Sequence, residues 1–268
     1  MRVVKGFFWG SLCLGFLLIA GCAGVDSSQG GASGLDLTTQ SDEPDVRKRA
    51  RLRIELASGY FEQGQTTIAL DEIKQALVSD PNYAPAYGLR GLVYMRLAET
   101  RLAEESFRKA LQINSRDANV AHNLGWLLCQ QGKYADALIL FSQALANPNY
   151  GGKARTLMTQ GICQARAGQP ADAEQSLTRS LELDSSNPVT AYNLARMLYQ
   201  RGAYMQAQLH LRRLNNGELA NAETLWLGIK AENRLGNRIA ERQLGDQLKR
   251  RYPQSRELGL YERGAFDE

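Results

Sequence analysis

The segment GKYADALILFSQAL, at residues 132–145, belongs to a sequence pattern that is repeated along the chain and decides the fold of this protein. Five further segments align with it. They read GQTTIALDEIKQAL (64–77), AETRLAEESFRKAL (98–111), GQPADAEQSLTRSL (168–181), GAYMQAQLHLRRLN (202–215) and GNRIAERQLGDQLK (236–249). The aligned alanines, separated by 34, 34, 36, 34 and 33 residues, are Ala69, Ala103, Ala137, Ala173, Ala207 and Ala240. Such a period predicts pairs of antiparallel helices stacked along the chain.

Small residues stand where the two helices of each unit must cross closely. The aligned alanines serve the second helix, and the corresponding small residues of the first helix are Ala57, Gly91, Gly125, Gly161, Ala195 and Gly228. A glycine also stands at the turn between the two helices, where a left-handed backbone is favoured. These turn glycines are Gly64, Gly132, Gly168 and Gly202, and in the second unit Ala98 takes their place.

With this period and these positions, residues from about 50 to 252 resemble the tetratricopeptide-repeat family. The resemblance implies an all-α fold, a superhelical solenoid of about six helix-turn-helix repeats. The expected solenoid spans 46–262 and leaves a C-terminal tail at 263–268. Its repeats are placed near 50–83, 84–117, 118–151, 154–187, 188–220 and 221–253. The alternative is a single globular helical bundle.

In this family, positions 2, 5, 6, 9, 12 and 13 of each repeat point into a concave groove. Projecting them onto the chain gives a candidate partner-binding groove of Phe61, Met95, Arg96, Asn123, Trp126, Met158, Arg166, Tyr192, Asn193, Arg196 and Tyr199. The projection also includes His122. Large apolar side chains exposed together typically mark a binding surface, and amides can both donate to and accept from a peptide backbone. The alternative is that the apolar members only pack between helices.

The N-terminus combines a basic head, a short apolar run and the residues LIAGC at 18–22. The apolar run is too short to cross a bilayer comfortably, and the pattern is typical of a secretory signal peptide. Its end resembles the bacterial lipobox, which implies a signal peptide at 1–21 and lipidation of Cys22. Ala23, where an aspartate would signal retention, implies the outer membrane, facing the periplasm. The alternative is a buried cysteine in an ordinary signal peptide.

Residues 22–45 should form the lipidated cysteine and a flexible tether, because they are rich in Gly, Ser, Asp and Thr and contain almost nothing to bury. The run of basic residues that follows, from Arg47 to Arg53, is either a solvated helix face or a contact for anionic lipid or a partner. Both interpretations stay open.

Composition and spacing argue against several other functions. The formal net charge is only +4, which gives no reason to expect a nucleic-acid partner. The two histidines lie on different repeats without metal-ligand spacing. No nucleophile motif, phosphate loop or paired carboxylates appear, so we expect neither an enzyme nor a cofactor beyond the covalent lipid. Cys129 and Cys163 fall in adjacent first helices, but their projected positions face each other poorly, so we expect free buried thiols.

The lipobox, tether and repeats together resemble the type IV pilus biogenesis and stability lipoproteins, the pilotin family called PilF or PilW. The resemblance is most specific at RLRIELASGYFEQGQTTIALDEIKQAL (51–77) and HNLGWLLCQQGKYADALILFSQAL (122–145). It implies a protein, expected to be monomeric by itself, that binds the pilus secretin and promotes its outer-membrane localisation and multimerisation. Pilus biogenesis and twitching would then depend on it. The alternative is an adaptor for another envelope system, such as barrel assembly, tight-adherence pili or cell-wall hydrolases.

Overall fold

The computed structural model describes residues 43–267, and within this range the chain folds into helices and no strands. The predicted signal peptide, Cys22 and all of the tether but its last residues lie outside the described residues. In the described part, no helix is both long and apolar enough to span a membrane. The helices are α1 (Asp45–Glu62), α2 (Thr66–Ser79), α3 (Ala84–Arg96), α4 (Thr100–Ile113), α5 (Ala118–Gln130), α6 (Tyr134–Leu145), α7 (Lys153–Arg166), α8 (Pro170–Leu183), α9 (Pro188–Gln200), α10 (Tyr204–Asn215), α11 (Ala222–Arg234), α12 (Arg238–Arg251) and α13 (Arg256–Glu262).

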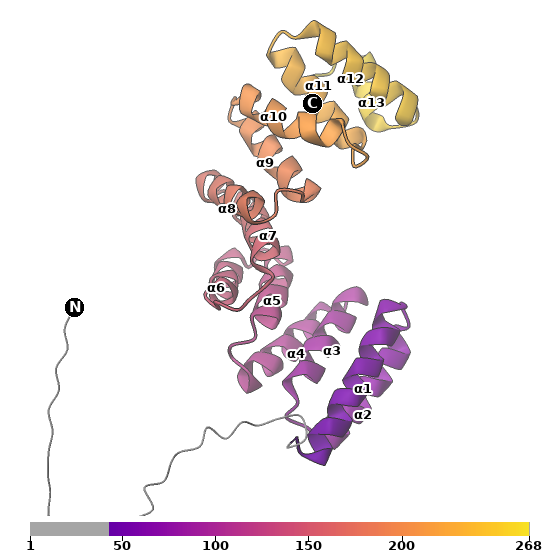
Figure 1. The fold of residues 1–268 in the computed structure, drawn as a ribbon, viewed down its shortest axis with the longest axis vertical. Helices are drawn as coiled ribbons and strands as arrows, with labels where there is room; N and C mark the ends of the chain where they lie inside the picture. Colours follow the sequence, from indigo (N-terminus) through magenta and orange to yellow (C-terminus); the bar gives the residue numbers. More distant parts are fainter. Residues whose placement is uncertain (1–42, 268) are drawn as a thin grey trace, which may run out of the picture. The chain divides into compact units, whose positions relative to one another are not determined.

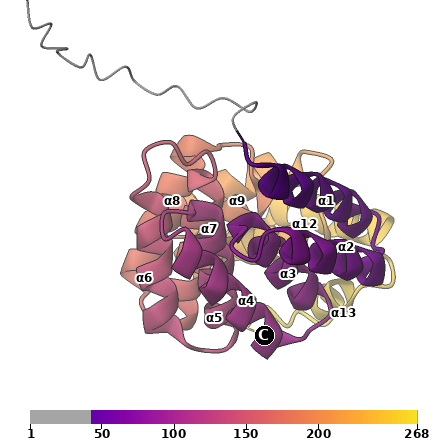
Figure 2. The ribbon, with the colours of Figure 1, turned by 90° about the horizontal axis from the view of Figure 1, so that it is seen from below.

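The helices pack as consecutive pairs, from α1 with α2 to α11 with α12, and each pair packs against the next (Figure 1). Figure 2 views the same stack from below, with the first repeats in front. The short helix α13 packs on α11 and α12, as the first helix of a further repeat would. The predicted solenoid of about six helix-turn-helix repeats is therefore confirmed.

The turn between the helices of each repeat requires a left-handed residue, as predicted. The φ angles of the turn glycines lie between 75° and 84° for Gly64, Gly132, Gly168 and Gly202. Ala98, which replaces the glycine in the second repeat, has a φ of 59°. This conformation places Cβ too close to a carbonyl oxygen in an L-residue, so Ala98 carries a backbone strain that glycine would not.

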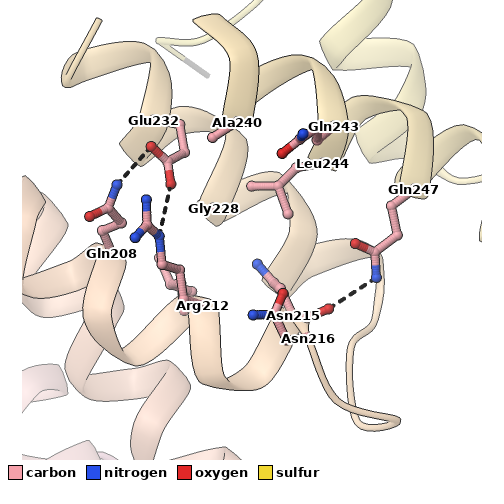
Figure 3. Close-up of a pocket in the computed structure, with 11 residues that line it drawn as sticks. Gln208, Arg212, Asn215, Asn216, Gly228, Glu232, Ala240, Gln243, Leu244 and Gln247 are labelled. Carbon is pink, nitrogen blue, oxygen red and sulfur yellow. Dashed lines mark hydrogen bonds and ion pairs between the residues drawn. The ribbon is translucent and has the colours of Figure 1, made fainter. Parts of the chain in front are cut away.

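The predicted small sites bring the helices of a repeat into close contact. Five of the six aligned alanines are fully buried: Ala69, Ala103, Ala137, Ala173 and Ala207. The sixth assignment is wrong, because Ala240 is partly exposed and the next residue, Glu241, is buried. Glu241 lies 34 residues after Ala207, which restores the ordinary period. Ala240 instead borders a cavity between α10, α11 and α12 (Figure 3).

The expectation of free thiols is also wrong, because Cys129 of α5 and Cys163 of α7 form a disulfide. Their Cα atoms are 5.9 Å apart, within the usual range for a disulfide. Neighbouring first helices pack directly against each other. A cysteine at one position of a repeat can therefore contact a cysteine at a different position of the next repeat. The expectation of free thiols assumed that the two cysteines would have to occupy equivalent positions.

His122, which the projection placed in the groove, is buried between the third and fourth repeats instead. The Thr156 hydroxyl lies 2.8 Å from His122 Nδ1, and the Tyr150 hydroxyl lies 2.9 Å from the same Thr156 oxygen. Tyr150 belongs to the longer connection between these repeats, so the extra residues of this junction supply a buried hydrogen-bonded chain. Burial and the charge of Arg155 lower the pKa of His122 to about 4.

The basic run at the start of α1 is largely paired within the fold. Arg47 contacts Asp80, the C-cap residue of α2, at 2.9 Å, and Arg53 contacts Glu72 of α2 at 2.8 Å. Arg51 contacts Glu43 and Glu55. The pairs of Arg47 and Arg53 tie α1 to α2. Lys48 and Arg49 are the exposed basic residues of the run without an ion pair among the described residues.

Candidate functional site

All eleven residues of the candidate groove lie on first helices of the repeats, and none is fully buried. The three arginines are exposed, and the other members are partly exposed. Met95 and Trp126 also pack against the core of the second to fourth repeats. Met158, Tyr192 and Tyr199 pack similarly against the core of the fourth to sixth. The apolar members therefore both pack between helices and present part of their surface.

Basic side chains cover two of the groove's aromatic rings. The guanidinium of Arg96 lies 3.6 Å from the centroid of the Phe61 ring, and it donates a hydrogen bond to the Phe61 carbonyl oxygen. Arg166 lies 5.4 Å from the centroid of the Trp126 ring. Each contact joins one first helix to the next, and such cation–π contacts contribute about 0.5–1 kcal/mol at exposed sites. At Phe61 and Trp126 the groove therefore presents an arginine beside an aromatic ring that remains partly exposed.

The two asparagines of the groove differ in their hydrogen bonding. Asn193 donates to the Val189 carbonyl oxygen at 2.8 Å and accepts from Arg196 at 3.3 Å. The Asn123 amide makes no hydrogen bond to another described residue. Of the two amides, Asn123 is the one whose donor and acceptor are both open to a ligand.

A cavity of about 310 Å³ lies at the C-terminal end of the groove, between α9, α11 and α13. Tyr192, Arg196 and Tyr199 line it from α9. The lining continues onto α11 with Trp226 and Lys230, and the Lys230 ammonium lies 5.6 Å from the Tyr199 ring centroid and 5.4 Å from that of Trp226. Partial burial lowers the pKa of Lys230.

The α11 residues of this cavity were missed by the sequence projection, which ended with the fifth repeat. Helix α11 begins at Ala222, with Asn221 as its N-cap, one residue after the predicted start of the sixth repeat. Counted from Ala222, Trp226 and Lys230 occupy positions 5 and 9 of the repeat, two of the groove positions. The N-cap asparagine was the signal that could have corrected the register.

A second cavity lies between α10, α11 and α12 and is lined mainly by polar side chains (Figure 3). The buried Glu232 carboxylate accepts a hydrogen bond from Gln208 at 2.7 Å and pairs with Arg212 at 3.5 Å. The Asn215 side-chain oxygen is buried without a hydrogen-bond partner among the described residues. No predicted groove residue lines this cavity.

The repeats and the whole body match known proteins. Residues 82–148 and 122–188 match models described as tetratricopeptide repeat. The type IV pilus assembly protein PilF of Pseudomonas aeruginosa is 32% identical over 204 residues, which cover 76% of this chain and 81% of that protein.

Two solved structures agree with this relationship. The structure of Pseudomonas aeruginosa PilF superposes with a TM-score of 0.76 at 30% identity, covering 82% of this chain and 100% of that one. The structure of PilW, described as a widely conserved type IV pilus biogenesis factor, gives a TM-score of 0.73 at 32% identity and covers 82% and 99%. The chain therefore belongs to the PilF and PilW family of tetratricopeptide-repeat proteins of type IV pilus biogenesis.

Proposed function

We propose that this protein is an outer-membrane lipoprotein adaptor, a pilotin, that binds the type IV pilus secretin and promotes its localisation and multimerisation. Membership of the PilF and PilW family supports a role in pilus biogenesis. The observation that carries the binding proposal is the groove itself. It combines the open amide of Asn123 with the partly exposed Trp126 ring one turn further along α5.

The proposed mechanism needs no chemical step by the protein. An extended segment of the secretin lies along the first helices, where Asn123 bonds its backbone and the large rigid ring of Trp126 provides an anchor of the kind that dominates binding energy. The lipid on Cys22 holds the adaptor at the outer membrane, where bound secretin subunits gather and assemble.

The groove is tested by the double variant Asn123→Ala with Trp126→Ala. Losing a polar partner costs about 1–3 kcal/mol and losing an aromatic anchor about 2 kcal/mol or more. Affinity for the purified secretin should therefore fall about a hundredfold or more. The matched control is Ile139→Ala on the second helix α6, where the side chain is 67% exposed. Normal secretin binding by a correctly folded double variant would exclude the groove as the binding surface.

The anchor is tested separately by Cys22→Ser. Labelling of cells with a fatty acid should mark the wild-type protein and leave the variant unlabelled, and the variant should leave the membrane fraction. Several acyl chains are needed for stable anchoring, since each buried CH₂ contributes only about 0.8 kcal/mol. A variant that still takes up the label would contradict lipidation at Cys22.

A further inference from the structure

Two residues of the chain's own C-terminal segment contact α11, the first helix of the sixth repeat. Their side chains indicate which kind of ligand this helix can bind. The ring of Phe266 stacks on that of Trp226, with centroids 5.7 Å apart and planes at 23°. Asp267 accepts a hydrogen bond from Arg234 and pairs with its charge. Trp226 and Arg234 are the fifth and thirteenth residues of α11, both groove positions of the repeat.

The same Trp226 ring also lines the cavity between α9, α11 and α13. Three basic side chains from three helices line this cavity, namely Arg196, Lys230 and Arg256. Two glutamates line it as well, Glu223 and Glu257, each in the first turn of its helix. Because negative charge in the first turn is stabilised by the helix dipole, these glutamates already have a favourable setting. Three basic groups against two carboxylates leave the lining of the cavity with a formal excess of one positive charge.

The side chains of this cavity and its edge favour two kinds of group on a ligand. Guanidinium groups match the geometry of a carboxylate and can bind it through two parallel hydrogen bonds. Aromatic rings such as those of Tyr199 and Trp226 prefer to stack on another ring. Phe266 and Asp267 supply this combination within the chain itself, as an aromatic residue followed directly by an acidic one.

We propose that the C-terminal end of the groove, defined by Arg196, Trp226, Lys230 and Arg234, binds an extended acidic segment of a partner protein that carries an aromatic residue. The segment's ring lies against the partly exposed ring of Tyr199, and its carboxylates lie against the basic side chains. This inference rests on the proposed function, because it states which kind of partner segment the groove accepts.

The test uses the full-length protein in detergent and three fluorescent peptides, DFDEFD, its neutral counterpart NFNQFN and the basic KFKKFK. Anisotropy titrations should show the acidic peptide binding at least about tenfold more tightly than the neutral one. Its affinity should fall as salt is raised, since charge attraction is screened. Equal affinity for the neutral peptide would show a merely apolar groove, and preference for the basic peptide would reverse the charge assignment. Either result overturns the proposal.

Matched variants place the effect on the cavity. Arg196→Gln and Lys230→Gln should each weaken the acidic peptide about tenfold and leave the neutral peptide unchanged. Lys249→Gln and Arg250→Gln remove the same charges from exposed positions of α12, outside the cavity, and should have no such effect. Equal losses from both sets would show that only net charge matters and would contradict a defined site. The salt titration of the wild-type protein keeps the proposal testable even if a variant fails to fold.

Secretin binding separates this inference from the proposed function. If the secretin binds wild type and the Lys230→Gln variant equally, and the acidic peptide does not compete, the inference is wrong and the proposed function stands. If the secretin does not bind while the acidic peptide binds with the expected dependence on Arg196 and Lys230, the proposed function is wrong and the acidic site stands.

Discussion

Phe107 of α4 lies so close to Gly91 of α3 that a β-carbon built at residue 91 would stand 2.5 Å from the Phe107 ring. Phe107 is fully buried and cannot move away without disturbing the core of the second repeat. The same relationship returns in the third repeat, where a β-carbon at Gly125 would stand 2.9 Å from the ring of Phe141. A missing side chain on the first helix thus provides the space for a large ring on the second.

Gly91→Ala should therefore destabilise the protein by about 1–3 kcal/mol, the usual cost of overpacking a well-packed core. Urea unfolding measured by circular dichroism gives this value directly. Gly59→Ala is the control, because a β-carbon at Gly59 meets no atom within 4 Å. There alanine should stabilise the helix by about 0.5–1 kcal/mol. Equal effects at the two sites would contradict the packing argument.

Ala98→Gly should stabilise the protein by up to about 1 kcal/mol, because it relieves a left-handed alanine that costs about 1–2 kcal/mol. The gain is reduced by the greater freedom of glycine in the unfolded chain. The reverse change at an equivalent turn, Gly64→Ala, should destabilise by a similar amount, since Gly64 has a φ of 78°. Thermal unfolding of both variants checks the pair, and a destabilised Ala98→Gly protein would show that the turn is not strained.

The sequence predicted the repeats well because their spacing and small residues follow directly from close helix packing. It failed where a small change in register mattered. Taking Ala240 instead of Glu241 as the small site followed from matching residue type, although a buried glutamate occupies the regular position. Trp226 and Lys230 on α11 were missed because the groove positions were projected only as far as the fifth repeat.

The groove was harder to predict than the fold. The position of a residue within its repeat places its Cα atom on the helix, but it does not determine what the side chain contacts. His122 occupies a groove position, yet its imidazole turns into the junction with the fourth repeat, where Thr156 lies within hydrogen-bonding distance. The disulfide was missed for a related reason, since the relative placement of α5 and α7 is a property of their packing. Contacts between repeats depend on that packing, and the sequence pattern of a single repeat does not determine it.

Removing the disulfide by Cys129→Ser should lower the free energy of unfolding by about 2–4 kcal/mol, because a cross-link between residues 34 apart restricts the unfolded chain. Chemical denaturation with and without a reductant measures the effect. The reductant should destabilise wild type to nearly the level of the variant and leave the variant unchanged. Wild-type stability that is insensitive to a reductant able to reach the unfolded chain would contradict the bond.

The buried His122 should make the protein less stable in mild acid. The unfolded chain takes up a proton on this imidazole as the pH falls through its ordinary pKa of 6.5, whereas the folded protein does so only near pH 4. Stability from this group is therefore fully present above pH 6.5 and is lost as the pH falls toward 4. Linkage gives a loss of about 2 kcal/mol between pH 7.5 and 5. Urea midpoints measured across this range should fall more steeply in wild type than in His122→Gln, in which His210, whose pKa burial also lowers, still contributes. An identical pH dependence in both proteins would contradict the role of His122.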